Sequence, residues 1–168
     1  MTPKQVKTEE INELLDRGVE QILPTKEKLR EALLAGKPLR IKHGIDPTGA
    51  NIHIGRAIVE WKLKQFQDSG HKIVLIIGDF TAQIGDPSDK LEKRPFLTKE
   101  QVKKNMKNYL PQIGRILDLK KTEIRYNSEW LSKLNLRDTS HLMEQFTFQQ
   151  MMQRRNFKER WKSDSDIT

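Results

Sequence analysis

The sequence predicts an α/β fold, in which a parallel β-sheet is flanked by helices. A strand-like run at residues 39–45 is followed by an amphipathic helical pattern at residues 54–68. A short apolar run rich in β-branched side chains then follows at residues 72–77. Strand, helix and strand in this order almost always form a right-handed parallel crossover. A third strand is expected at residues 123–127, so strands and helices alternate along the chain.

The N-terminal part, residues 1–38, is expected to be helical. Apolar side chains recur at helical spacing across residues 9–23. Thr25 is placed to cap a second helix, which should stop at Gly36. This part of the chain therefore precedes the first strand as a pair of helices.

The segment between the second and third strands divides into a loop and a helix. Residues 78–97 carry turn-forming side chains throughout and predict a long loop. Thr98, with Gln101 three places on, forms a capping box that opens the helix. Pro111 should kink or split this helix, because proline has no backbone N–H to donate.

Composition limits the classes of function. The chain has 168 residues, no cysteine and a formal net charge of +8. The positive charge favours a polyanionic partner, namely nucleic acid, nucleotide phosphate or an anionic membrane surface, or else belongs to a solvated, lysine-rich surface. The absence of cysteine excludes disulfides and fits a reducing compartment, the cytoplasm. The longest apolar run, residues 73–77, is too short to cross a membrane.

The first chemically distinctive stretch is residues 42–56, where the first strand gives way to a helix. Ligands of open α/β sheets bind beyond the carboxyl ends of the strands, and a helix N-terminus favours phosphate. His53 lies at that N-terminus, Gly55 permits a close approach, and Asp46 can accept a hydrogen bond from an amine or a sugar hydroxyl. Taken singly, Asp46 is more often only a turn residue, and a lone His53 at a helix start is more often a cap or a packing residue.

The second stretch, residues 78–94, follows the second strand and should return to the same edge. Asp79 and Asp86 are anions that need a cation there, either an ammonium group or Mg²⁺. Lys90 and Arg94 offer the opposite charge to phosphate oxygens, or else form a solvated mixed-charge loop.

Together these stretches resemble one family. His-Ile-Gly-Arg at residues 53–56 is similar to the His-Ile-Gly-His signature of class I aminoacyl-tRNA synthetases. Gly-Ile-Asp-Pro-Thr at residues 44–48 and Gly-Asp-Phe-Thr-Ala at residues 78–82 resemble the bacterial-type tyrosyl enzymes, as does Asn-Ser-Glu-Trp-Leu at residues 127–131. The resemblance implies a Rossmann-like sheet, the first half of a class I synthetase catalytic domain.

The resemblance also implies an organisation and an activity. Residues 1–38 would be N-terminal helices, residues 39–127 the nucleotide-binding half, and residues 128–168 a truncated helical insertion that faces the dimer partner and tRNA. The family activates L-tyrosine with ATP, accompanied by Mg²⁺, and transfers the tyrosyl group to tRNA(Tyr). The full-length enzyme would be a homodimer, without a membrane segment or a resident metal site.

By the same resemblance, His53 and Arg56 would contact the ATP phosphates, and Lys90 and Arg94 the departing pyrophosphate. Arg56 stands in place of the second histidine of the signature, and keeps a positive charge there. Other implied substrate-binding positions are Lys42, Gly44, Asp46, Thr48, Gly55, Asp79, Thr81 and Asp86.

The chain departs from the family pattern in ways that affect activity. Asp89 replaces a glycine beside Lys90. The family's Lys-Met-Ser-Lys-Ser-like loop and the groups that read the tyrosine hydroxyl are not found, so catalysis by this chain alone is expected to be weak or absent. The alternative is a synthetase-derived module that binds nucleotide or RNA without turnover. A nucleotidyltransferase of the pantetheine-phosphate type is disfavoured by the Gly-Asp-Phe-Thr stretch at residues 78–81.

Overall fold

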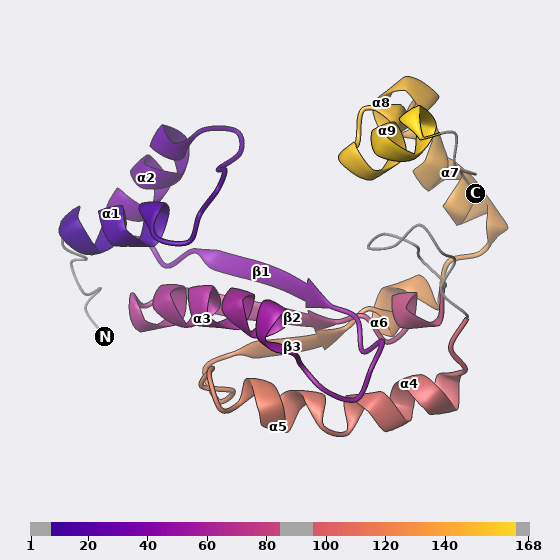
Figure 1. Ribbon diagram of the computed structural model, residues 1–168, viewed down its shortest axis with the longest axis horizontal. Coiled ribbons are helices and arrows are strands. Elements are labelled where there is room, and N and C mark those ends of the chain that lie inside the picture. The colour runs from indigo at the N-terminus through magenta and orange to yellow at the C-terminus, as the bar shows by residue number, and fades with distance from the viewer. Residues whose placement is uncertain (1–7, 85–95, 164–168) are drawn as a thin grey trace.

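A computed structural model describes residues 8–84 and 96–163. Its sheet consists of β1 (Arg40–Ile45), β2 (Lys72–Ile77) and β3 (Glu123–Tyr126), in the order β1-β2-β3. Both neighbouring pairs are parallel, with Ile45 opposite Ile77 and Ile77 opposite Tyr126. All three strands therefore end at the same edge, and the predicted α/β architecture is confirmed (Figure 1).

The helices lie where the sequence pattern places them, with some differences in length. In chain order the described helices are α1 (Thr8–Asp16), α2 (Lys26–Leu34), α3 (Ile54–Asp68), the 3₁₀ turn η1 (Thr81–Gln83), α4 (Lys99–Met106), α5 (Tyr109–Ile113), α6 (Ser128–Leu131), α7 (Leu136–Glu144), α8 (Phe148–Met152) and α9 (Arg155–Lys162). The long loop expected after β2 thus contains a short 3₁₀ turn.

The N-terminal helices differ from prediction in one respect. α1 ends at Asp16 instead of continuing to residue 23, because Gly18 has a φ of 68°, a left-handed conformation that ends a helix. The Thr25 side chain accepts a hydrogen bond from the N–H of Lys28, so the predicted cap of α2 is confirmed. The ammonium group of Lys62 donates to the carbonyls of Leu14 and Arg17 and so ties the end of α1 to α3.

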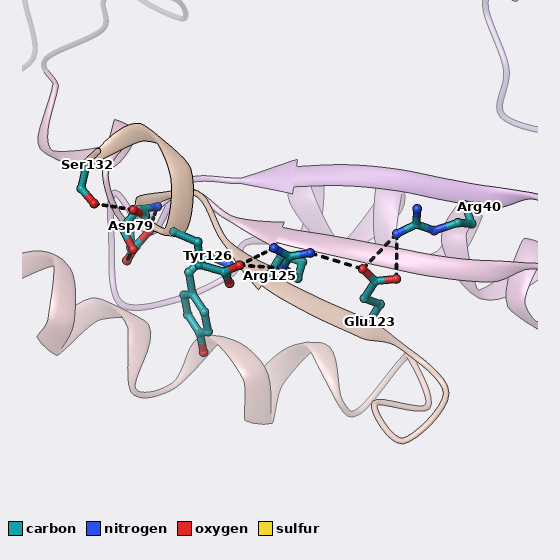
Figure 2. Close-up of polar contacts among 8 residues, drawn as sticks. Arg40, Asp79, Glu123, Arg125, Tyr126 and Ser132 are labelled. Carbon is teal, nitrogen blue, oxygen red and sulfur yellow. Dashed lines mark hydrogen bonds and ion pairs between the residues drawn. The ribbon is translucent and has the colours of Figure 1, made fainter. Parts of the chain in front are cut away.

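The main core lies between one face of the sheet and helices α3 and α5. It consists of Ile45, Leu63, Ile73, Leu75, Ile77, Tyr109, Ile113 and Leu117. Side chains of a strand alternate between its two faces, so the intervening residues of β1 and β3 face the other way. There Arg40, Glu123 and Arg125 form a row of ion pairs across the open face (Figure 2).

The helix that Pro111 was predicted to kink is split into α4 and α5. Thr98 and Gln101 form the expected capping box at the start of α4. Pro111 lies in the first turn of α5, where its missing N–H breaks no hydrogen bond within that helix. In Figure 1, α4 and α5 run together along the sheet and reach the strand ends.

The C-terminal helices stand apart from the sheet. Figure 1 shows α7, α8 and α9 grouped together at the opposite end of the molecule from α1 and α2. These helices and the link between α7 and α8 expose large apolar side chains, namely Leu136, Leu142, Met143, Phe146, Phe148 and Trp161. Within the described residues, no helix is both long enough and apolar enough to cross a membrane.

Candidate nucleotide-binding site

The N-terminus of α3 presents an exposed histidine. His53 occupies the cap position, but its side chain makes no capping hydrogen bond. A Cβ added at Gly55 would lie 3.2 Å from Nδ1 of His53, so the imidazole sits directly over this glycine. At Gly44, on the preceding strand, an added Cβ meets nothing within 4 Å. The space beside Gly44 and the imidazole of His53 are thus both available to a ligand.

A chain of hydrogen bonds joins the ends of all three strands. The hydroxyl of Thr81, which follows β2, donates to Oδ1 of Asp46, which follows β1, at 2.8 Å. Nδ2 of Asn127, which follows β3, donates to the same hydroxyl at 2.8 Å. Oδ1 of Asn127 accepts from the N–H of Phe80 at 2.9 Å. Because the three strands are parallel, their carboxyl ends lie at one edge of the sheet. This brings the residues together there, as predicted for Asp46 and Thr81.

Gly78 is required by this arrangement. A Cβ at this position would lie 1.7 Å from Oδ1 of Asp46 and 2.5 Å from the hydroxyl oxygen of Thr81. No side chain fits there without separating the two groups. The glycine therefore permits the close approach of the β1 and β2 ends.

Arg56 projects from the first turn of α3 back into the β1–α3 loop. Its guanidinium donates to the carbonyl of Asp46 at 3.1 Å, to the hydroxyl of Thr48 at 2.9 Å and to the phenol oxygen of Tyr109 at 2.7 Å. All three acceptors are uncharged, and among residues 8–84 and 96–163 no carboxylate forms an ion pair with Arg56. Its positive charge remains available to attract an anion at this edge.

Asp79 has a local structural role as well as its predicted position near the site. Its carboxylate accepts hydrogen bonds from the N–H of Ser128 at 2.9 Å and from the hydroxyl of Ser128 at 2.6 Å (Figure 2). Both oxygens are therefore engaged by the start of α6. These donors stabilise the anion, and whether an ammonium group or Mg²⁺ also meets it stays a prediction.

The other predicted positions divide into two groups. Lys42 lies on β1 and is exposed, on the same face of the strand as Gly44. Asp86, Lys90 and Arg94 lie outside the described residues, as does Asp89.

His43 of β1, which is half-buried, forms an ionisable pair with the fully buried Glu60 of α3. Glu60 of α3 is 0% exposed, and neither carboxylate oxygen has a hydrogen-bond partner in the described structure. Nε2 of His43 lies 3.5 Å from Oε1 of Glu60. Burial raises the pKa of Glu60 to about 7 and lowers the pKa of His43, because both charged forms lose hydration.

Several residues that contact the site were not among the predicted site residues. Asn127 joins the strand-end network, and Asn105, Tyr109 and Gln112 contact the β1–α3 loop from α4 and α5. Two signals were available: Asn127 directly follows a strand, and the other three are spaced by four and three residues, on one face of a helix. In the described ranges, no three His, Asp or Glu side chains gather in a way that would hold a metal.

The chain is similar to known proteins over most of its length. The family described as class I tRNA synthetases (W and Y) matches residues 34–168. A tyrosine–tRNA ligase of Carboxydothermus hydrogenoformans is 48% identical over 159 residues, which is 93% of this chain and 39% of that protein. One from Dehalococcoides mccartyi is 45% identical, covering 94% of this chain and 40% of the relative. The chain thus spans about two fifths of the length of these curated relatives.

Solved structures support the fold. A C-terminally truncated mitochondrial tyrosyl-tRNA synthetase of Aspergillus nidulans superimposes with a TM-score of 0.77 at 19% identity, covering 95% of this chain and 49% of that one. The tyrosyl-tRNA synthetase of Archaeoglobus fulgidus, solved in complex with L-tyrosine, gives a TM-score of 0.63 at 22% identity and covers 82% of this chain and 39% of that one. With a family match that extends over most of its length, the chain belongs to the class I tRNA synthetases of the W and Y group.

Proposed function

We propose that this chain supplies the ATP-binding and ammonium-binding part of a tyrosine–tRNA ligase. The observation that carries the proposal is the hydrogen-bonded network of Asp46, Thr81 and Asn127 at the carboxyl edge of the sheet, beside His53 and Arg56. Tyrosine is favoured as the amino acid by the names of the curated relatives. The other amino acid that the family description allows as the substrate is tryptophan.

In the proposed reaction, an oxygen of the tyrosine carboxylate attacks the α-phosphorus of ATP. The bond to the pyrophosphate oxygen breaks, and tyrosyl-adenylate and pyrophosphate are formed. A hydroxyl at the end of tRNA(Tyr) then attacks the tyrosyl carbonyl, and AMP leaves. No protein nucleophile is required, because positioning of the reactants and stabilisation of phosphate charge lower the barrier.

The charge of each side chain decides which part of the substrates it is proposed to bind. His53 and Arg56 are proposed to face the phosphates, since the first has an exposed imidazole and the second a charge not matched by a carboxylate in the described chain. Asp46, with Thr81, is proposed to receive the tyrosine ammonium group. Gly44 leaves room for the nucleotide.

The remaining assignments rest on the family resemblance. Lys42 would border the tyrosine pocket, Thr48 would reach toward the γ-phosphate, and Gly55 would leave room beside His53. Asp79 would support the site through α6. The resemblance also assigns Asp86 to the ammonium group and Lys90 and Arg94 to pyrophosphate. These three residues lie outside the part of the chain that the structure describes.

The proposed partners and parts of the whole enzyme also rest on the family resemblance. Mg²⁺ would enter bound to ATP, as part of the substrate. Residues 1–38 would form an N-terminal helical part, residues 39–127 the nucleotide-binding half, and residues 128–168 a surface for a second subunit and for tRNA(Tyr). The exposed apolar side chains of α7 to α9 support this last assignment. A cytoplasmic location is proposed, since the sequence contains no cysteine.

Tyrosine-dependent exchange of pyrophosphate into ATP tests the proposal. We expect little exchange from this chain alone. Exchange should appear in a chimera in which the chain replaces the matching 159-residue segment of the Carboxydothermus hydrogenoformans ligase. His53→Ala in that chimera should lower the exchange rate about 100-fold. A folded chimera without exchange would contradict the proposed function. Robust exchange by the chain alone would contradict the proposal that it supplies only part of the catalytic site.

A binding module without turnover is the second candidate. It is favoured by the formal net charge of +8, which suits a polyanionic partner such as tRNA. This function predicts that the chain alone binds tRNA(Tyr) with an affinity that falls steeply as salt increases, because lysine and arginine contacts release counterions. It also predicts that the chimera shows no exchange.

A further inference from the structure

Gln112 of α5 is hydrogen-bonded in both directions to the loop that connects β1 to α3. Its Oε1 accepts from the N–H of Ile52 at 2.9 Å, and its Nε2 donates to the carbonyl of Ala50 at 3.1 Å. The same Nε2 donates to the carbonyl of Asn108 at 2.9 Å, which fixes the amide against the backbone of its own helix. Both ends of the amide therefore bind the loop, and its nitrogen is also anchored to the start of α5.

Asn105 and Tyr109 contact the first part of the same loop. Nδ2 of Asn105 donates to the carbonyl of Pro47 at 3.0 Å. The hydroxyl of Tyr109 accepts from Arg56 at 2.7 Å and lies 3.5 Å from the carbonyl of Asp46. The ring of Tyr109 is 1% exposed and belongs to the main core, so its hydroxyl has a fixed position.

Few backbone hydrogen bonds within the loop itself hold its conformation. Between residues 46 and 52, the backbone hydrogen bond found within the loop is the one from the N–H of Thr48 to the carbonyl of Asp46, at 2.8 Å. The contacts from α4 and α5 are spread from Pro47 to Ile52 and therefore cover almost its whole length. Backbone groups that find such partners lose the freedom to adopt other conformations.

We propose that Asn105, Tyr109 and Gln112 are positioning residues that brace residues 46–52 in the shape that receives ATP. None of them needs to touch the nucleotide, since they act through the backbone of the loop and through Arg56. The inference rests on the proposed function, because that function makes this loop the nucleotide-binding one. Asp46 and His53, at either end of the loop, depend on the brace for their separation.

Amide hydrogen exchange and ATP calorimetry on the 168-residue chain test the brace. Gln112→Leu removes both loop contacts, whereas Gln112→Glu keeps an acceptor for the N–H of Ile52 and loses the donor to Ala50. Gln149→Leu, at an exposed position of α8, is the matched control. We expect Gln112→Leu to accelerate exchange at Ile52 and to weaken ATP binding, each about tenfold, a loss typical of one or two hydrogen bonds. In Gln112→Glu the second oxygen faces the carbonyls of Ala50 and Asn108, so this variant should recover only part of the protection of Ile52 and of the ATP affinity. The control should change neither.

Tyr109→Phe separates the brace from simple core packing. It keeps the buried ring and removes only the hydroxyl that holds Arg56, so ATP affinity should fall while the urea midpoint changes little. Unchanged exchange at Ile52 in Gln112→Leu would overturn the brace. Faster exchange at Ile52 with unchanged ATP affinity would overturn its role in nucleotide binding. Failure of the unsubstituted chain to bind ATP would instead overturn the proposed function.

Discussion

Replacing the buried carboxylate of Glu60 by an amide should change how stability depends on pH. The side chain is 0% exposed, and burial raises its pKa to about 7 from an ordinary value of 4.5. Folding therefore favours the protonated form. The contribution of Glu60 to the stability of the folded chain is greatest below pH 4.5 and is lost as the pH rises toward 7, because the unfolded chain then binds fewer protons than the folded one.

The size of the effect follows from the two pKa values. The gap between 4.5 and about 7, at about 1.4 kcal/mol per pKa unit, corresponds to about 3 kcal/mol above pH 7. His43 acts in the opposite direction, because its lowered pKa makes the folded chain less stable as the pH falls below 6.5. Because the two side chains lie 3.5 Å apart, comparing the chain with a Glu60 variant at each pH reports on the carboxylate together with its effect on His43.

Urea unfolding of the unsubstituted chain and of Glu60→Gln between about pH 4.5 and pH 8 is the assay. The variant should gain about 3 kcal/mol relative to the unsubstituted chain over this range. The amide that it introduces stays neutral at every pH and can donate a hydrogen bond toward His43. Glu31→Gln, on the exposed face of α2, should show no such trend. A difference between the two proteins that stays constant with pH would refute the reasoning.

Three further substitutions test the site and its supports. Gly78→Ala should destabilise the chain by about 1–3 kcal/mol in urea, because its Cβ collides with Asp46, whereas Gly49→Ala meets nothing within 4 Å and should be tolerated. Lys62→Met should cost about 2 kcal/mol and speed amide exchange in α1, whose terminal carbonyls lose a charged donor. Arg56→Lys keeps the positive charge but loses the forked N–H donors of the guanidinium, so calorimetry should show about tenfold weaker ATP binding. Unchanged ATP affinity would mean that the charge alone matters.

Much of the fold could be predicted because the signals for it are local. The apolar run at Lys72–Ile77 became β2 with the same limits, since a short, β-branched segment has few other ways to be buried. The cap of α4 depends on Thr98 and Gln101 alone, three residues apart. The end of α1 was placed too late, because apolar periodicity continues past Gly18 and was given more weight than the glycine, which is itself a helix-stop signal.

The site was predictable in position but not in its contacts. Parallel strands and motif order bring Asp46 and Thr81 to one edge, and the structure joins them directly. The partners of Arg56 could not be anticipated, because the hydroxyl of Tyr109 reaches it from 53 positions along the chain. Such contacts depend on how α5 packs against the sheet, which a short sequence motif does not encode.

Titration of the ¹⁵N-labelled chain with ATP, followed by amide chemical shifts, tests the central claim that the carboxyl edge of this sheet binds the nucleotide. The account predicts that the largest shift changes fall at residues 44–56 and 78–84, and that His53→Ala reduces them. Shift changes confined to α7–α9, or none at millimolar ATP, would contradict it.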